Sequence, residues 1–171
     1  TGVQTCALPI FKVNEAAYVP LTHSYMGVPQ QLDRDMVLRK LQPLLEDASK
    51  IKVGQHAKFD INILANCAID GDQSQGITVR GLAFDTMLES YVLDSIATRH
   101  DKDNLALKYL NHTNTSLQDI AGKGVKQLSF DQIALEQAAQ FAAEDADVTL
   151  RLHHALMARL AVTPRDRKSV V

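Results

Sequence analysis

Apolar side chains recur every three or four positions between Asp131 and Leu160, and this period predicts a long helix near the end of the chain. Shorter helices are predicted at residues 34–46, 58–67, 86–93, 104–110 and 117–121. Short apolar runs predict strands at residues 11–13, 17–20, 51–53 and 82–84. Along the chain, two predicted strands come first, predicted strands and helices then alternate, and the last predicted elements are all helices. We therefore predict an α/β fold with a mixed sheet flanked by helices.

One acidic residue interrupts the apolar face of the long helix. Asp145 falls in the middle of the apolar stripe, whereas Glu144 and Asp147 fall off it. A carboxylate on a buried face is unfavourable unless a cation or hydrogen bonds compensate it. We therefore expect Asp145 to carry chemistry and its two acidic neighbours to be solvated, with Asp147 paired to Arg151 four residues on.

A second carboxylate, Asp60, follows the strand predicted at residues 51–53 and shares one side of the next helix with Ile63 and Leu64. Open α/β sheets bind ligands just past the ends of their strands. Oxygen ligands are those that Mg²⁺ and Mn²⁺ favour. Two inward carboxylates on separate helices, Asp60 and Asp145, indicate a divalent-metal site. The alternative is that each aspartate hydrogen-bonds locally to backbone or to a lysine.

Composition excludes several classes of protein. The chain has 171 residues, enough for one domain, and its net charge of −2 gives no sign of a surface that coats nucleic acid, which leaves room for a local groove. Outside the first ten residues, Cys67 is the only cysteine, which excludes a disulfide there and a cysteine-rich zinc site. It suits a reducing compartment, so we expect a cytoplasmic protein. No apolar run approaches the length of a membrane span, so we expect no membrane partner.

Both ends of the chain read as foreign. Residues 1–10 resemble the conceptual translation of a short-read sequencing adapter, and residues 166–171 resemble that of another. We therefore exclude both from the fold prediction, as one would an expression scar, and place the domain at residues 11–165.

Five segments carry a resemblance to a known family: Val53–Asp60 (VGQHAKFD), Gly81–Leu93 (GLAFDTMLESYVL), Arg99–Asp101 (RHD), Ile120–Gly124 (IAGKG) and Phe141–Thr149 (FAAEDADVT). In this order and at nearly the expected spacing, they closely resemble the 3′→5′ proofreading exonuclease domain of bacterial family A DNA polymerases, the DNA polymerase I type. The resemblance runs from about Phe11 to Leu160, and the loop at residues 70–78 looks like an insertion.

The resemblance implies a ribonuclease H-like fold and membership of the DEDD exonucleases, which use two divalent metals, Mg²⁺ or Mn²⁺, held by four carboxylates. Asp60 matches the third of these carboxylates and Asp145 matches the fourth. The first two belong to an Asp-x-Glu motif on a first strand that would precede Phe11, and no such motif occurs before Asp60. The resemblance therefore implies that the first strand is missing and that this chain, as written, is inactive.

The chain also departs from the family at aromatic positions. Phe141 stands where the family has a tyrosine whose hydroxyl helps orient the attacking water. Phe59 likewise replaces a tyrosine, and His56 stands where asparagine is common. The resemblance assigns substrate binding to a further set of residues, of which the charged ones are otherwise ordinary surface residues: Gln55, His56, Phe59, Arg99, His100, Leu117 and Lys123.

The activity implied is hydrolysis of the 3′-terminal phosphodiester of single-stranded or frayed DNA. The polymerase domain of the same parent chain is the expected partner, and a monomer is expected. One alternative is a ribonuclease D-like RNA exonuclease, against which the Ile120–Gly124 and Arg99–Asp101 segments argue. The other is a non-catalytic structural domain of a polymerase, against which retention of Asp60 and Asp145 argues for the parent protein.

Overall fold

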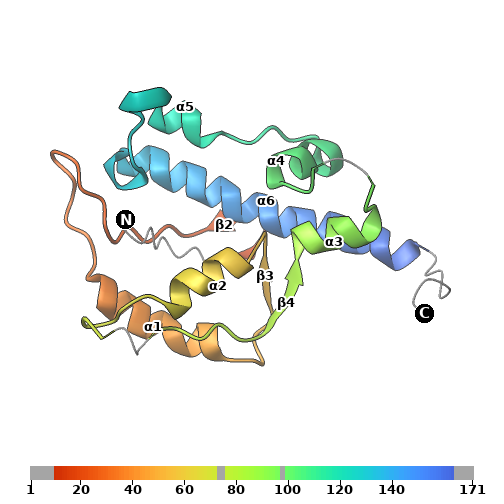
Figure 1. Ribbon diagram of the computed structural model, residues 1–171, viewed down its shortest axis with the longest axis horizontal. Coiled ribbons are helices and arrows are strands. Elements are labelled where there is room, and N and C mark those ends of the chain that lie inside the picture. The colour runs from red at the N-terminus through yellow and green to blue at the C-terminus, as the bar shows by residue number, and fades with distance from the viewer. Residues whose placement is uncertain (1–9, 73–75, 97–98, 164–171) are drawn as a thin grey trace.

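The computed structural model describes residues 10–72, 76–96 and 99–163. The two ends predicted to be foreign, residues 1–10 and 166–171, lie outside the described residues except for Ile10. A single long helix, α6 (Leu135–Val162), runs through the molecule. Figure 1 shows α4 and α5 along one side of α6 and α1 and α2 on the other, with α3 lying across it.

The strands form two separate pairs. β1 (Ile10–Lys12) pairs with β2 (Glu15–Ala16) in an antiparallel hairpin, and β3 (Lys52–Gly54) pairs with β4 (Leu82–Asp85) in parallel. The predicted α/β class is confirmed, but among the described residues the pairs do not join into the single mixed sheet that the sequence suggested. The predicted strand at residues 17–20 is not one. It contains Pro20, which has no N–H to donate to a ladder.

The helices lie close to their predicted positions. They are α1 (Arg34–Glu46), α2 (Lys58–Ala65), α3 (Thr86–Leu93), α4 (Lys102–Leu105), which continues as a π-helical turn over Ala106–Leu110, and α5 (Leu117–Ala121). Helices α1 and α3 are each capped by an aspartate, because the Asp33 and Asp85 carboxylates accept the backbone N–H of Met36 and Met87. α6 begins four residues later than predicted, since Ala134 is still extended at φ −54° and ψ 135°.

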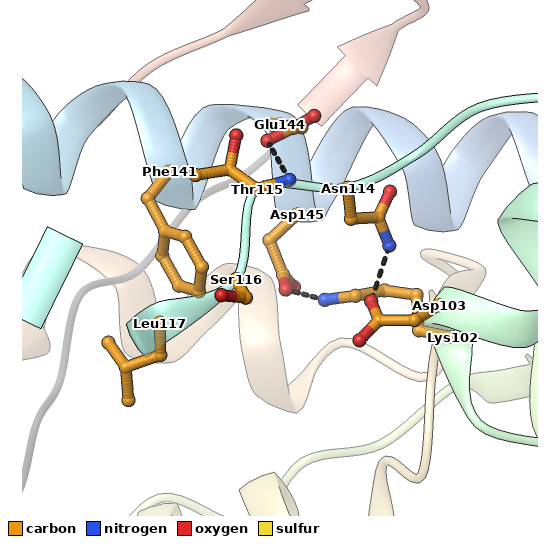
Figure 2. A pocket seen from close by; sticks show the side chains of 9 residues that line it. All are labelled: Lys102, Asp103, Asn114, Thr115, Ser116, Leu117, Phe141, Glu144 and Asp145. Atoms are coloured by element: carbon orange, nitrogen blue, oxygen red, sulfur yellow. Dashed lines mark hydrogen bonds and ion pairs between the residues drawn. The ribbon is translucent and has the colours of Figure 1, made fainter. Parts of the chain in front are cut away.

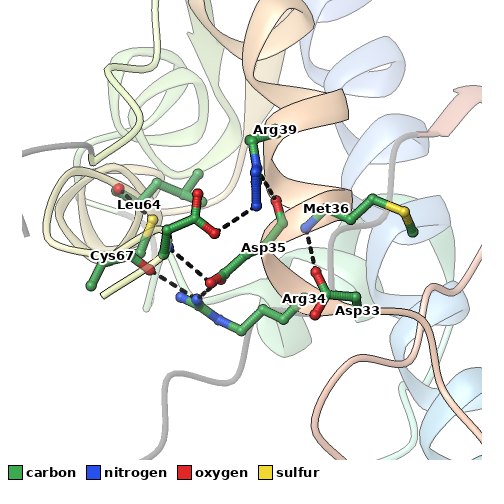
Figure 3. A network of polar contacts seen from close by, with 9 residues as sticks. Asp33, Arg34, Asp35, Met36, Arg39, Leu64 and Cys67 are labelled. Atoms are coloured by element: carbon green, nitrogen blue, oxygen red, sulfur yellow. Dashed lines mark hydrogen bonds and ion pairs between the residues drawn. The ribbon is translucent and has the colours of Figure 1, made fainter. Parts of the chain in front are cut away.

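A polar network joins α1 to the loop after α2 (Figure 3). Arg34 donates to the Ala68 carbonyl at 2.9 Å, and Arg39 pairs with Asp70 at 2.6 Å. Asp35 accepts the backbone N–H of Asp70 at 2.9 Å. Because these contacts fix the loop, α2 is anchored at its C-terminal end and its first turn is presented beside β3.

Three apolar clusters form the core, and the largest lies under the middle of α6. There Val148, Leu152 and Leu156 pack against Leu105 and Ala106. A second cluster fills the space between α1 and the end of α2, and a third lies where α5 meets the start of α6. Within the described residues, no helix is long and apolar enough to cross a membrane.

Two large apolar side chains of the helices do not face the core. Met36 is 39% exposed and Phe59 is 61% exposed. Both occupy the first turn of their helices, α1 and α2, while the buried side chains of each segment come later along the chain. Local periodicity identified an apolar face but could not say how far along each helix that face is covered.

Candidate active site

Asp145 lies in the middle of α6, and its carboxylate forms an ion pair with the ammonium group of Lys102, the first residue of α4. Both side chains face a cavity of about 270 Å³ (Figure 2). We call this the Asp145 cavity; its lining consists of Lys102, Asp103, Asn114, Thr115, Ser116, Leu117, Phe141, Glu144 and Asp145.

Three acidic residues of α6, Glu144, Asp145 and Asp147, are buried in a different order from the one predicted. The Asp145 side chain is 44% exposed, whereas those of Glu144 and Asp147 are 22% and 16% exposed. Asp147 is covered by the hairpin, because the Asn14 N–H donates to it at 2.6 Å. The predicted pair of Asp147 with Arg151 is confirmed at 3.4 Å. Asp145 is therefore the most open of the three because it faces the cavity, and the prediction of a buried Asp145 between solvated neighbours was wrong.

Glu144 holds one wall of the cavity in place. Its carboxylate lies 2.8 Å from His112 Nε2 and accepts the Thr115 backbone N–H at 3.1 Å. These bonds outweigh the effect of burial and keep the pKa of Glu144 below its usual value. An ionised Glu144 thus ties the segment that follows the π-helical turn to α6, next to Asp145.

The Asp85 carboxylate holds the turn that leads to Asp60. It accepts the backbone N–H groups of His56 at 3.1 Å and Ala57 at 2.8 Å, besides capping α3 at Met87. His56 has a φ of 54°, in the left-handed region where histidine and asparagine are enriched. Asp85 therefore fixes the backbone that delivers Asp60 to the first turn of α2.

Asp60 is exposed rather than inward, which corrects the prediction. Its carboxylate is nonetheless partly desolvated by the atoms around it, and this raises its pKa, with a further rise from Asp85. His56 and Lys102 act in the opposite direction. Asp60 and Asp145 thus share an interaction with the same ammonium group.

Lys102 is more buried than either aspartate, with 20% of its side chain exposed. Burial lowers its pKa, while the carboxylates of Asp103, Glu144 and Asp60 favour the charged form. A lysine here was not singled out from the sequence. It follows directly on the Arg99–Asp101 segment, but nothing local shows that its partner lies on α6.

The residues that face this region carry oxygen donors of the kind that divalent cations prefer. Among the described residues, they supply too few of these donors for a metal site. Carboxylate oxygens suit Mg²⁺ and Mn²⁺. The cavity also holds a buried amide oxygen, Asn114 Oδ1, that has no hydrogen-bond partner among the described residues. However, no three histidine, cysteine or acidic side chains of the described residues cluster as a metal site. Because Lys102 engages Asp145, the described residues alone do not make a two-metal centre.

Phe141 and Leu117 supply the apolar part of the cavity lining. Phe141 lies one helical turn before Asp145, and its ring packs against Phe130 with the centroids 6.1 Å apart. Leu117 is 41% exposed at the start of α5. Figure 2 shows the Phe141 ring directed toward Ser116 and Leu117, so two residues predicted from the resemblance do meet beside Asp145.

Gln55 and His100 also lie together, at the end of β3. Gln55 donates to the His100 carbonyl at 3.2 Å and accepts a hydrogen bond from the Thr86 hydroxyl. His100 Nδ1 lies 2.8 Å from the Ser90 hydroxyl, and its ring packs edge-on against Tyr91. The polar groups of Gln55 and His100 therefore have hydrogen-bond partners within the protein.

The other predicted substrate contacts are scattered. Arg99, Lys123, His56 and Phe59 are all exposed, and none of them lines the Asp145 cavity. Their predicted role in substrate binding stays a prediction.

The sequence matches the 3′-5′ exonuclease family over residues 3–161. The chain belongs to this family. It is 69% identical over 153 residues to DNA polymerase I of Pseudomonas aeruginosa and 41% identical over 154 residues to that of Rhizobium leguminosarum. These alignments cover 90% and 85% of this chain but only 16% and 14% of the two polymerases. The chain thus spans about a sixth of the length of its curated relatives.

Among solved structures, this 3′-5′ exonuclease chain is similar to the EXD2 exonuclease domain soaked in Mn, with 21% identity and a TM-score of 0.26 over 71% of this chain and 56% of that one. A similarity this low does not show which residues of the two proteins correspond. The positions of Asp60, Asp145 and Phe141 within the family therefore rest on the sequence.

Proposed function

We propose that this chain is the larger part of a domain that removes nucleotides one at a time from the 3′ end of single-stranded or frayed DNA. The observation that carries the proposal is the Asp145 cavity, in which a partly exposed carboxylate lies one helical turn from the Phe141 ring and beside Leu117. Family membership and the identity to DNA polymerase I over most of the chain support the same activity.

The cavity lining suits a single strand better than a duplex. Phe141 and Leu117 offer apolar surface against which a base can pack. A paired terminus must first unstack, at a cost of a few kcal/mol, so a mismatched end is the favoured substrate.

Asp60 and Asp145 are the residues that would hold a divalent cation. Mg²⁺ or Mn²⁺ bound there would supply water activation and charge neutralisation at the phosphodiester. The residues of the chain would position the substrate: Glu144 fixes the cavity wall, and the Phe141 ring would pack against a base of the single-stranded DNA. Since two carboxylates are too few for two such ions, we propose that the 171-residue chain alone does not turn over substrate.

We propose that the domain works in the cytoplasm, as a monomer, in the same parent chain as a polymerase domain, and that the parent chain supplies the remaining two carboxylates. The alignment to DNA polymerases I supports a polymerase domain in the same parent chain.

A specific observation supports a second candidate. The Lys102–Asp145 ion pair satisfies Asp145 without any metal, as expected in a non-catalytic domain that only supports a polymerase. An RNA exonuclease of the same chemistry has no comparable support, since the curated relatives named above are DNA polymerases.

The test uses the longer parent polymerase and the 171-residue chain side by side. Each is incubated with 5′-labelled single-stranded DNA, blunt duplex DNA or single-stranded RNA, with Mg²⁺ and then with Mn²⁺. We expect the parent to shorten single-stranded DNA stepwise, the duplex more slowly and RNA least, and we expect the 171-residue chain to leave all three intact. A parent that leaves DNA intact would support the non-catalytic candidate, and RNA shortened faster than DNA would overturn the substrate assignment. Robust degradation by the 171-residue chain would overturn the proposed inactivity.

A further inference from the structure

Helix α3 has its polar and apolar sides reversed. A helix at the surface of a protein normally turns its apolar side chains inward and its polar ones outward. The exposed side chains of α3 are all apolar, with Leu88 57% exposed, Tyr91 56% and Val92 74%. We call these three residues the α3 face. The buried side chains of the same helix are polar, namely Thr86, Glu89 and Ser90.

Two of the buried polar side chains fix the direction in which α3 faces. The Thr86 hydroxyl donates to the side chain of Gln55, just after β3. The Glu89 carboxylate bonds to His153 of α6. Turning α3 over to bury its apolar side would break both contacts and leave polar groups without these partners, which is unfavourable. The domain therefore has to present the α3 face outward.

The α3 face fits an apolar protein surface and not a nucleic acid. None of the exposed side chains of α3 is charged, so nothing on this face attracts the phosphates of DNA or an acidic peptide. Contiguous apolar side chains on a surface mark a site of contact with other protein.

Area and attachment favour another domain of the same chain over a second copy. Three side chains present less apolar area than the roughly 800 Å² per partner that a stable complex of separate chains buries. A tethered domain can dock on a smaller face, because the tether supplies a high effective concentration. The alignments cover only 16% and 14% of the two polymerases, so most of such a chain lies outside the structure. Figure 1 shows α3 beside the C-terminal half of α6, the last described helix.

We propose that the polymerase domain of the parent chain packs an apolar surface on the α3 face. The Glu89–His153 pair connects α3 to α6, so this contact also fixes the helix that carries Asp145 relative to the polymerase domain. The inference rests on the proposed function in that it takes the chain as part of a polymerase.

The experiment uses the longer parent polymerase with a photo-reactive side chain on the α3 face, introduced as Tyr91→p-benzoylphenylalanine. Irradiation joins this side chain to whatever packs on it, and mass spectrometry identifies the joined peptides. Val125→p-benzoylphenylalanine is the matched control, because Val125 is also apolar and fully exposed but lies in the turn after α5. DNA synthesis by the same preparations checks that each variant is folded.

We expect the Tyr91 variant to be joined to the polymerase domain of the same molecule, at a yield at least about fivefold above that of the Val125 variant and unchanged by about tenfold dilution. Adding Val92→Asp should lower the yield at least about fivefold, because docking would then bury an unpaired carboxylate. Cross-links confined to the exonuclease domain, cross-links between two molecules that fade on dilution, or a yield no higher than that of the control would each overturn the proposal. So would a yield that survives Val92→Asp.

This result and the proposed function fail separately. A parent polymerase that leaves DNA intact but gives the expected cross-link would refute the exonuclease assignment and keep the docking. A parent that degrades DNA but gives no cross-link from the α3 face to the polymerase domain would refute the docking alone.

Discussion

The imidazole of His153 on α6 lies 2.7 Å from the carboxylate of Glu89 on α3, measured from Nδ1 to Oε1. Both side chains are nearly enclosed, at 14% and 7% exposed, and the His153 ring packs on Phe84 of β4 with the centroids 4.6 Å apart. The second oxygen, Glu89 Oε2, is buried without a hydrogen-bond partner among the described residues. The pair thus joins the β4–α3 unit to the helix that carries Asp145.

Burial raises the pKa of Glu89 above its ordinary value of 4.5, and this outweighs the opposing effect of His153. The stability that Glu89 contributes is therefore present below its ordinary pKa and is lost as the pH rises through its higher folded value. We expect Glu89→Gln to gain in free energy of unfolding, relative to the unchanged chain, as the pH is raised from about 4 to about 7. Urea denaturation at several pH values measures this difference. Glu136→Gln, at an exposed position of α6, is the control. A difference that is flat or falls with pH would contradict the assignment of burial as the main cause.

Asp85 should contribute more to stability than an ordinary helix cap. Its carboxylate accepts three backbone N–H groups, from His56, Ala57 and Met87, whereas among the described residues the Asp33 carboxylate accepts one, that of Met36. We expect Asp85→Ala to lower the free energy of unfolding by about 2–4 kcal/mol and Asp33→Ala by about 1 kcal/mol. Urea denaturation of the two variants tests the comparison, and equal losses would show that the turn before α2 does not depend on Asp85.

In the absence of metal, Asp60 should slightly lower the stability of the folded chain. Since its pKa is raised by desolvation, the ionised form is disfavoured in the folded chain, and this loss grows as the pH rises through the folded pKa. In chelator-treated buffer at neutral pH, we expect Asp60→Asn to leave thermal stability unchanged or raise it by up to about 0.5 kcal/mol. At pH values below the ordinary pKa of aspartate, the gain should vanish. A loss above about 1 kcal/mol would mean that Asp60 makes a structural bond.

Phe141 offers a gain-of-function test in the parent polymerase. Phe141→Tyr would place a hydroxyl in the Asp145 cavity, one helical turn from Asp145, where it could hold an attacking water. We expect the exonuclease rate to rise about tenfold to a hundredfold, as positioning effects of this kind often do, with little change in binding of single-stranded DNA. Phe130→Tyr, at the neighbouring ring outside the cavity lining, should have no such effect. An unchanged or lower rate in Phe141→Tyr would mean that another group orients the water.

The helices of this chain could be predicted because their signals are local. Asp33 and Asp85 each precede a helix they cap, and the break after α5 falls at Gly122, whose φ is 80°. Strand pairing could not be predicted, because it depends on partners far along the chain. The exposure of Asp145 could not be predicted for the same reason, because it also depends on contacts with residues far along the chain. Periodicity placed it on an apolar stripe, but which carboxylate of α6 is covered is decided by the distant Asn14.

The sequence singled out three of the residues that line the Asp145 cavity, and their roles stay predictions. The sequence identified Asp60, Asp145, Phe141 and Leu117, of which the last three share one cavity. It did not identify Lys102, since the partner of a lysine is set by tertiary packing and leaves no mark on the local sequence. The glutamate that holds the cavity wall, Glu144, was taken for a solvated residue for the same reason.

The central claim is that Asp145 is a catalytic carboxylate, and the sharpest test replaces it in the parent polymerase. Asp145→Asn is compared with Asp147→Asn, a matched change on the same helix at a residue bonded to Asn14 and Arg151 outside the cavity. Release of nucleotides from 3′-labelled single-stranded DNA and DNA synthesis are measured on the same preparations. We predict that Asp145→Asn lowers release by at least about a hundredfold and leaves synthesis intact, while Asp147→Asn changes neither by more than a few-fold. Release that persists in Asp145→Asn, or that falls equally in both variants, would contradict the claim.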